Sequence, residues 1–332
     1  MSLAFAALLI GAAAAHGTLV VVNKSDSTVS LVRLGDGAVA ATVQTGASPH
    51  EVAVSPDGAT ALVTNYGTGP SPGSTLTVID VRGRRAARTI AVGAGARPHG
   101  VAFLDARRAL VTAEGKKALL VVDVANGALE ASIETGQEVS HMVATTPDGK
   151  RAFVANIRSG TMTAVDLAAR KVLAQVPTGD GAEGIAMTPD GKEVWVTNRA
   201  VDTVSVVDAR ELKVIATLPS ASFPIRVAIT PDGRRALVTN ARSGDVAVLD
   251  VATRKELGRM RATLEGGSGE GRVLAFAGST PIGVVIHPAG DRAYVAHATA
   301  DAIAVFDLGK LQLTGTIRAG REPDGMALSP LQ

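Results

Sequence analysis

Three of the six histidines in the chain occupy equivalent positions of a sequence repeat. His50, His99 and His141 each open a short apolar segment, the next repeat carries Glu183 at the same place, and Asp324 occupies it near the end of the chain. Imidazole nitrogens that converge can share one first-row transition metal ion, and carboxylates can act as further ligands or orient the imidazoles. The sequence therefore predicts a site for Zn, Cu or Fe built from these five residues.

Two other interpretations of the histidines stay open. His50 and His99 both follow proline, and a repeat protein can use this position for a polar side chain that bonds a neighbouring loop or a ligand. Repeat duplication can also copy a histidine into several units without any metal. If a metal is bound, Glu183 or Asp324 is either a ligand or the base for a bound water.

Basic side chains are expected on the same rim as the histidines. Arginine binds a carboxylate through two parallel hydrogen bonds, so a cluster of arginines beside histidine and glutamate suits a small anionic ligand. Solvated surface arginines are the alternative. The candidate ligand-binding residues are Arg97, Arg158, Arg226 and Arg242.

The elements that must position these residues follow from a repeat of about 42 residues. Aspartates end alternating apolar runs at successive gaps of 43, 43, 42, 42 and 57 residues, and Pro-Asp-Gly turns recur between the runs. Such a period, filled with short β-branched runs, is typical of a four-stranded propeller blade. Sustained helical periodicity is absent, so the chain is predicted to be all-β.

Counting the blades gives a seven-bladed β-propeller with four antiparallel strands per blade. Six units are complete, and the first supplies only three strands, at 18–23, 28–33 and 39–43. A lone strand at 324–329 is predicted to complete that blade and close the ring, which removes both sheet edges. Residues 16–332 are therefore expected to form a single domain.

The strand motifs carry a family resemblance. Segments such as Leu62-Val-Thr-Asn65, Trp195-Val-Thr-Asn198 and Leu237-Val-Thr-Asn240, with the Pro-Asp-Gly turns, resemble the YVTN-repeat, YncE-like family of exported β-propellers. The resemblance covers residues 18–332 and implies the fold. It does not imply one function, because this family includes binding proteins and has enzymatic relatives.

A shorter resemblance is to the propeller lactonases. The segment Gly95-Ala-Arg-Pro-His99 followed by Glu114, and the later Asn198-Arg199, are similar to their motifs, although Ala113 stands where those enzymes have asparagine. This resemblance implies His99 as acid/base, Glu114 as its partner and Arg199 as a carboxylate clamp.

Composition excludes several classes of function. The chain has no cysteine, which rules out disulfides and thiolate chemistry, and its net charge is +2 with 3% aromatic residues, so a nucleic-acid partner is not expected. Residues 1–15 resemble a signal peptide with an A-x-A cleavage site, although no basic residue precedes the apolar stretch, and a short membrane anchor is the alternative. We expect a periplasmic or secreted monomer without membrane attachment after cleavage.

Two long irregular segments, 67–74 and 261–280, are predicted on the rim that carries the histidines, and the second is a candidate lid. Three function hypotheses follow from the sequence. The first is an exported propeller that binds a small ligand, with or without a metal. The second is a lactonase-type hydrolase that uses the same rim. The third is a scaffold that binds another exported protein without catalysis.

Overall fold

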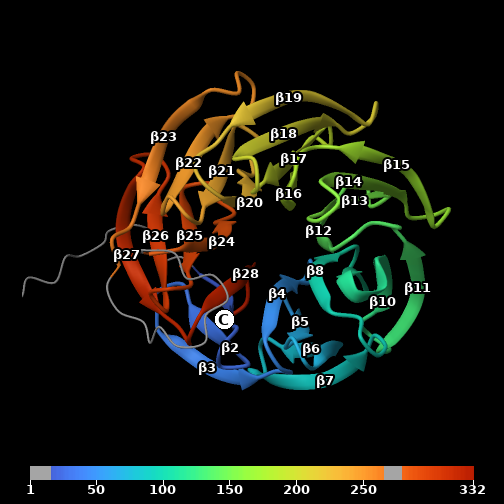
Figure 1. Ribbon diagram of the computed structural model, residues 1–332. Helices are drawn as coiled ribbons and strands as arrows, with labels where there is room; N and C mark the ends of the chain where they lie inside the picture. Colours follow the sequence, from blue (N-terminus) through green and yellow to red (C-terminus); the bar gives the residue numbers. More distant parts are fainter. Residues whose placement is uncertain (1–15, 265–278) are drawn as a thin grey trace, which may run out of the picture.

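The computed structural model describes residues 16–264 and 279–332. The predicted signal peptide and most of the predicted lid lie outside these residues. The chain forms seven four-stranded antiparallel sheets arranged as the blades of a closed ring around a central opening (Figure 1). The predicted seven-bladed propeller is confirmed. Across the described residues, no helix is long and apolar enough to span a membrane.

Strand order within each blade runs from the central opening to the circumference. The innermost strands are β4 (Pro49–Val54), β8 (Pro98–Phe103), β12 (Ser140–Thr145), β16 (Ala182–Met187), β20 (Pro224–Ile229), β24 (Pro281–Ile286) and β28 (Pro323–Ser329). The second strands are β1 (Thr18–Asn23), β5 (Thr60–Gly67), β9 (Arg108–Ala113), β13 (Arg151–Asn156), β17 (Glu193–Asn198), β21 (Arg235–Asn240) and β25 (Arg292–His297). The third strands are β2 (Thr28–Arg33), β6 (Pro72–Asp80), β10 (Ala118–Asp123), β14 (Thr161–Asp166), β18 (Thr203–Asp208), β22 (Asp245–Asp250) and β26 (Ala302–Asp307). The outermost strands are β3 (Val39–Gln44), β7 (Arg85–Ala91), β11 (Ala128–Glu134), β15 (Lys171–Pro177), β19 (Lys213–Pro219), β23 (Glu256–Arg261) and β27 (Gln312–Arg318).

Ring closure follows the prediction. Strand β28 pairs antiparallel with β1, so one blade combines the two ends of the described chain and has the order β28-β1-β2-β3. We number the blades from this one, so blade 2 is β4–β7 and blade 7 is β24–β27. Because every blade then has two neighbours, both faces of each sheet are covered, and Trp195, Phe153 and Phe306 are completely buried between blades.

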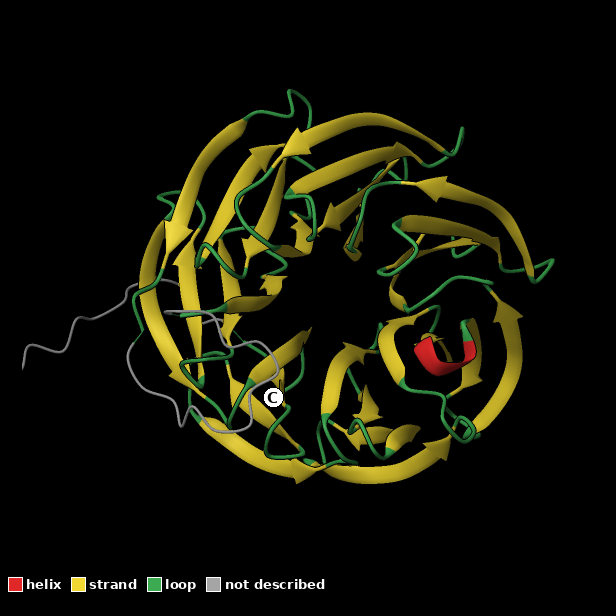
Figure 2. Cartoon of the chain, viewed as in Figure 1, coloured by secondary structure: helices red, strands yellow, loops and turns green. Residues whose placement is uncertain are grey.

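The segment 67–74 is more regular than predicted. Instead of an irregular loop, it lengthens the β5–β6 hairpin, in which Gly67 pairs with Pro72. Gly67 has a φ of +80°, a conformation that glycine adopts without strain, and this allows the hairpin to continue past Asn65. The only helix in the described residues is a 3₁₀ turn, η1 (Glu114–Lys116), which is red in Figure 2.

Candidate functional site

The site residues lie on a β-bulge that recurs in the innermost strand of all seven blades. In blade 2, the pairing steps from Pro49–Asn65 to Val52–Val63, so two residues, His50 and Glu51, face the single residue Thr64. The other six blades show a register shift at the same place. A bulge turns side chains away from strict alternation, so these strands can aim polar groups at the channel mouth.

The first bulge position carries the residues that the sequence aligned. Around the ring they are Asp324, His50, His99, His141, Glu183, Ile225 and Ile282. The predicted ring of candidate ligands therefore exists as a structural feature, and all seven side chains line one cavity of about 1000 Å³.

The second bulge position mostly excludes side chains. A Cβ on Gly100 would lie 2.5 Å from the carbonyl oxygen of His141, and one on Gly184 would lie 2.6 Å from that of Ile225, because the next innermost strand passes close by. Two blades instead carry charged residues of opposite sign here, Glu51 and Arg226. The sequence analysis missed Glu51 and gave Arg226 only as a candidate ligand-binding residue. Aligning this second position of the bulge across the repeats could have shown the pair.

Threonines in the second strands of blades 2, 3 and 6 attach the innermost strand of the next blade to their own blade. The hydroxyl of Thr64 donates to the His99 carbonyl at 2.7 Å, and that of Thr112 donates to the His141 carbonyl at 2.5 Å. All of these groups are buried, so the bonds fix the backbone of the histidines independently of their side chains.

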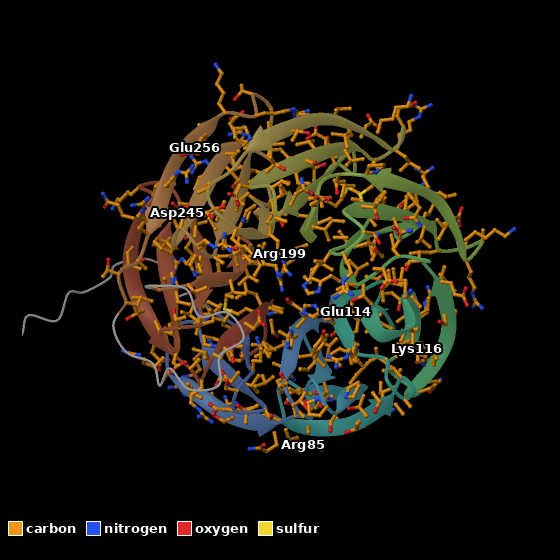
Figure 3. All side chains as sticks on the ribbon, in the orientation of Figure 1. Arg85, Glu114, Lys116, Arg199, Asp245 and Glu256 are labelled. Atoms are coloured by element: carbon orange, nitrogen blue, oxygen red, sulfur yellow. The ribbon has the colours of Figure 1, made fainter. Side chains whose placement is uncertain are left out.

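A buried group of three residues on blades 3 and 4 can hold a metal ion. One ligand atom from each of His99, Glu114 and His141 lies within 4.8 Å of the other two. Two histidines and a carboxylate form a common ligand set for zinc and for non-haem iron. Figure 3 shows Glu114 beside the central opening, where the 3₁₀ turn η1 presents it.

Hydrogen bonds orient this group. The Glu114 carboxylate accepts from the Tyr66 hydroxyl at 2.6 Å and lies 2.5 Å from Nδ1 of His141, while Nε2 of His99 lies 2.9 Å from Nδ1 of His50. The His99 and His141 rings stack with centroids 3.6 Å apart. Nδ1 of His99 is buried without a hydrogen-bond partner and is available to a ligand, whereas Nε2 of His141 faces the Glu183 carboxylate at 3.4 Å.

Burial and neighbouring charges set the protonation of the site. Burial lowers the pKa of His50 and of His99 well below the usual value, so both rings are neutral at pH 7. Burial also opposes charging of His141, but hydrogen bonds and charges from Glu114 and Glu183 outweigh it and raise the pKa of His141.

Two further site groups have displaced pKa values. Burial opposes ionisation of Glu183, yet His141, Arg199 and Arg226 lower the pKa of Glu183 to about 2. Burial raises the pKa of Tyr66 to about 12, helped by the Glu114 carboxylate.

A buried ion pair crosses the channel beside the triad. From blade 6, Arg226 reaches Glu51 on blade 2 at 2.6 Å and Glu183 on blade 5 at 3.2 Å. Arg199, which Figure 3 shows at the central opening, bonds the other oxygen of Glu183 at 2.5 Å. On blade 1, Asp324 lies 3.9 Å from both Lys24 and His50, and burial raises the pKa of Asp324 to about 6.

The other predicted residues are placed as follows. Arg158 lines the cavity, whereas Arg97 and Arg242 are not among its lining residues. The Arg97 guanidinium donates to the carbonyls of Thr68 and Gly69, and that of Arg242 lies over the ring of Phe223. Of the residues that the lactonase resemblance implied, Glu114 bonds His141 and Tyr66, His99 bonds His50, and Arg199 bonds Glu183.

Comparison with known proteins agrees with this architecture. A structure titled hydrazine synthase, from Kuenenia stuttgartiensis, is similar with a TM-score of 0.72 and 20% identity, over 85% of this chain and 90% of that one. A functionally unknown protein from Desulfotomaculum acetoxidans is similar with a TM-score of 0.78 and 14% identity, over 95% and 100% of the two chains. At these identities the likeness shows the fold alone.

No curated protein matches the sequence. Residues 109–271 match the family described as YNCE-like beta-propeller, which agrees with the repeat motifs and with the closed ring of seven blades. Over these residues, which make up just under half of the chain, the sequence is similar to the YNCE-like β-propeller family.

Proposed function

We propose that this protein is an exported β-propeller that binds one divalent transition metal ion at the channel mouth and, beside it, a small ligand. The observation that supports this most is the convergence of His99, His141 and Glu114, whose ligand atoms lie within 4.8 Å of one another. Proteins rarely bury such groups together without a purpose, because each charged or polar group that is not satisfied costs free energy.

The chain's own residues are arranged for this role. His99 is neutral because burial lowers its pKa, and it therefore offers a lone pair without first losing a proton. The raised pKa of His141 means that binding a metal there releases a proton, and Glu114 and Glu183 supply negative charge on either side of that ring. The metal would supply Lewis-acid binding of a donor atom of the ligand.

The metal content of protein purified without an affinity tag tests the proposal. We expect about one zinc, iron or copper ion per chain by elemental analysis, and loss of that ion in His99→Ala and His141→Ala. His287→Ala is the matched control, because His287 pairs with Asp291 outside the cavity and its loss should leave the metal in place. If protein supplied with each of these metals holds none, metal binding is ruled out. If His99→Ala keeps a full equivalent, the metal is not bound at the proposed site.

Export is part of the proposal and rests on residues 1–15. Comparing the mature N-terminus with the encoded one in a bacterial expression host tests it, with His16 expected as the first residue after cleavage. The lactonase alternative predicts lactone hydrolysis that persists in metal-free protein, and the scaffold alternative predicts that neither metal nor a small ligand changes the melting temperature.

A further inference from the structure

Among the described residues that line the cavity, one cationic side chain is left for a ligand. These lining residues include five lysines and arginines, and four of the five are paired within the protein. The four pairs are Lys24 with Glu322, Arg199 with Glu183, Arg226 with Glu51, and Arg321 with Asp26. A charge that is already neutralised by a close carboxylate has little to offer an incoming anion.

Arg158 is the fifth cation. It follows β13 by two residues and is exposed, and within the described residues its guanidinium forms no hydrogen bond or ion pair. Glu138 feels the charge of Arg158, but the Glu138 carboxylate is bonded to Lys117. The planar, two-pronged donor face of Arg158 is therefore available at the edge of the cavity.

The opposite wall of the cavity is apolar. Ile225 and Ile282 occupy the bulge positions of blades 6 and 7, where blades 2 to 5 carry histidine or glutamate, and both are nearly completely buried. Each packs in a small apolar cluster with Ala241, Ala298 and Phe223. Figure 1 shows that blades 6 and 7 lie across the central opening from blades 3 and 4, which carry the proposed metal ligands and Arg158.

We propose that the ligand is a small organic carboxylic acid with a short apolar chain, whose carboxylate pairs with Arg158 and whose chain lies on Ile225 and Ile282. This inference rests on the proposed function for the location of the site, and it adds the chemical class of the ligand. The apolar wall favours a monoacid with an aliphatic or aromatic body. A sugar or a polyanion is disfavoured because it would place polar groups without hydrogen-bond partners against the isoleucines.

Titration with acetate, butyrate, hexanoate and uncharged hexanamide, followed by calorimetry on the protein as purified, tests the inference. Affinity should rise about fourfold for each methylene group that is buried, and hexanamide should bind at least tenfold more weakly than hexanoate. Arg158→Gln should remove that preference for the acid, and Ile282→Ala should flatten the dependence on chain length.

The matched control is Arg242→Gln. Arg158 and Arg242 both stand two residues after the repeated asparagine, at Asn156 and Asn240, but Arg242 does not line the cavity. Equal binding of hexanoate and hexanamide, no dependence on chain length, or equal losses in the two arginine variants would overturn the inference. The metal content of Arg158→Gln is measured in parallel and should be unchanged. If the purified protein contains no metal but still prefers hexanoate through Arg158, the proposal of a metal site is wrong and the proposal of a carboxylic-acid ligand stands.

Discussion

Replacing Arg226 with methionine should be the most destabilising single change that the site offers. The Arg226 side chain is 8% exposed, and its guanidinium donates twice to Glu51, at 2.6 and 3.2 Å, and once to Glu183 at 3.2 Å. Within the described residues, Glu51 has no other side-chain hydrogen bond or ion pair, whereas Glu183 keeps Arg199 and His141. The variant therefore leaves one buried carboxylate without its counter-ion.

The expected cost follows from that accounting of partners. Removing one partner of a buried ion pair destabilises a protein by about 3–5 kcal/mol. For a domain of this length, that corresponds to a fall in melting temperature of roughly 4–8 °C, measured by calorimetry at pH 7. The double variant Arg226→Met, Glu51→Leu should recover most of the lost stability, because two apolar side chains of similar size pack together and no buried charge is left without a partner.

Arg199→Met is the matched control for this prediction. Arg199 is 29% exposed and its partner Glu183 keeps Arg226, so the expected loss is only about 1 kcal/mol. A loss below 1 kcal/mol for Arg226→Met, or a double variant that is less stable than the single one, would show that the Arg226–Glu51 contact does not connect blades 6 and 2 as the structure indicates.

Three other changes have expected outcomes. Val139 has a φ of 59° immediately before β12, a strained conformation for a β-branched residue, so Val139→Gly should raise the free energy of unfolding by about 1 kcal/mol in urea titrations; a loss of stability would contradict the strain. Deleting residues 323–332 removes β28 and exposes the edge of β1, so the truncated protein should aggregate in size-exclusion chromatography, and an unchanged monomer would refute the closure. Burial raises the pKa of Asp324 to about 6, above its unfolded value, so its contribution to stability is fully present below about pH 4 and is lost as pH rises through 6. Asp324→Asn should therefore raise the melting temperature at pH 8 but not at pH 4, and a gain at both pH values would contradict the role of ionisation.

The fold could be predicted because its signals are local and repeated. Strands β1 and β2 begin and end at the predicted residues, and β28 was predicted to within one residue, because an apolar run marks each strand and short polar or glycine-containing turns follow β1 and β2. Serine or threonine before these turns bonds the aspartate, as Thr188 bonds Asp190 at 2.7 Å. Each such turn is specified within a few residues, so no long-range information is needed to find it.

For the candidate site, the sequence predicts which residues face the channel mouth but not how they pair. The repeat period places His50, His99, His141 and Glu183 at one level of the ring, and the structure confirms that level. The repeat period does not reveal which side chains bond each other, because these pairings depend on packing between blades. Glu114 was expected to be the partner of His99, whereas in the structure its carboxylate bonds His141 and Tyr66.

The pair Glu51–Arg226, which was not predicted from the sequence, shows what a repeat pattern cannot reveal. Within one blade, alternation places Glu51 on the face opposite to His50, and only the bulge brings both toward the channel. The partner stands 175 residues further along the chain, in a blade that shares no sheet with blade 2. A contact across the channel breaks the repeat symmetry, since it needs opposite charges in two particular blades. Departures from symmetry in a repeat protein are therefore the positions that deserve functional tests, and here they are the charged residues Glu51 and Arg226, the available Arg158 and the apolar Ile225 and Ile282.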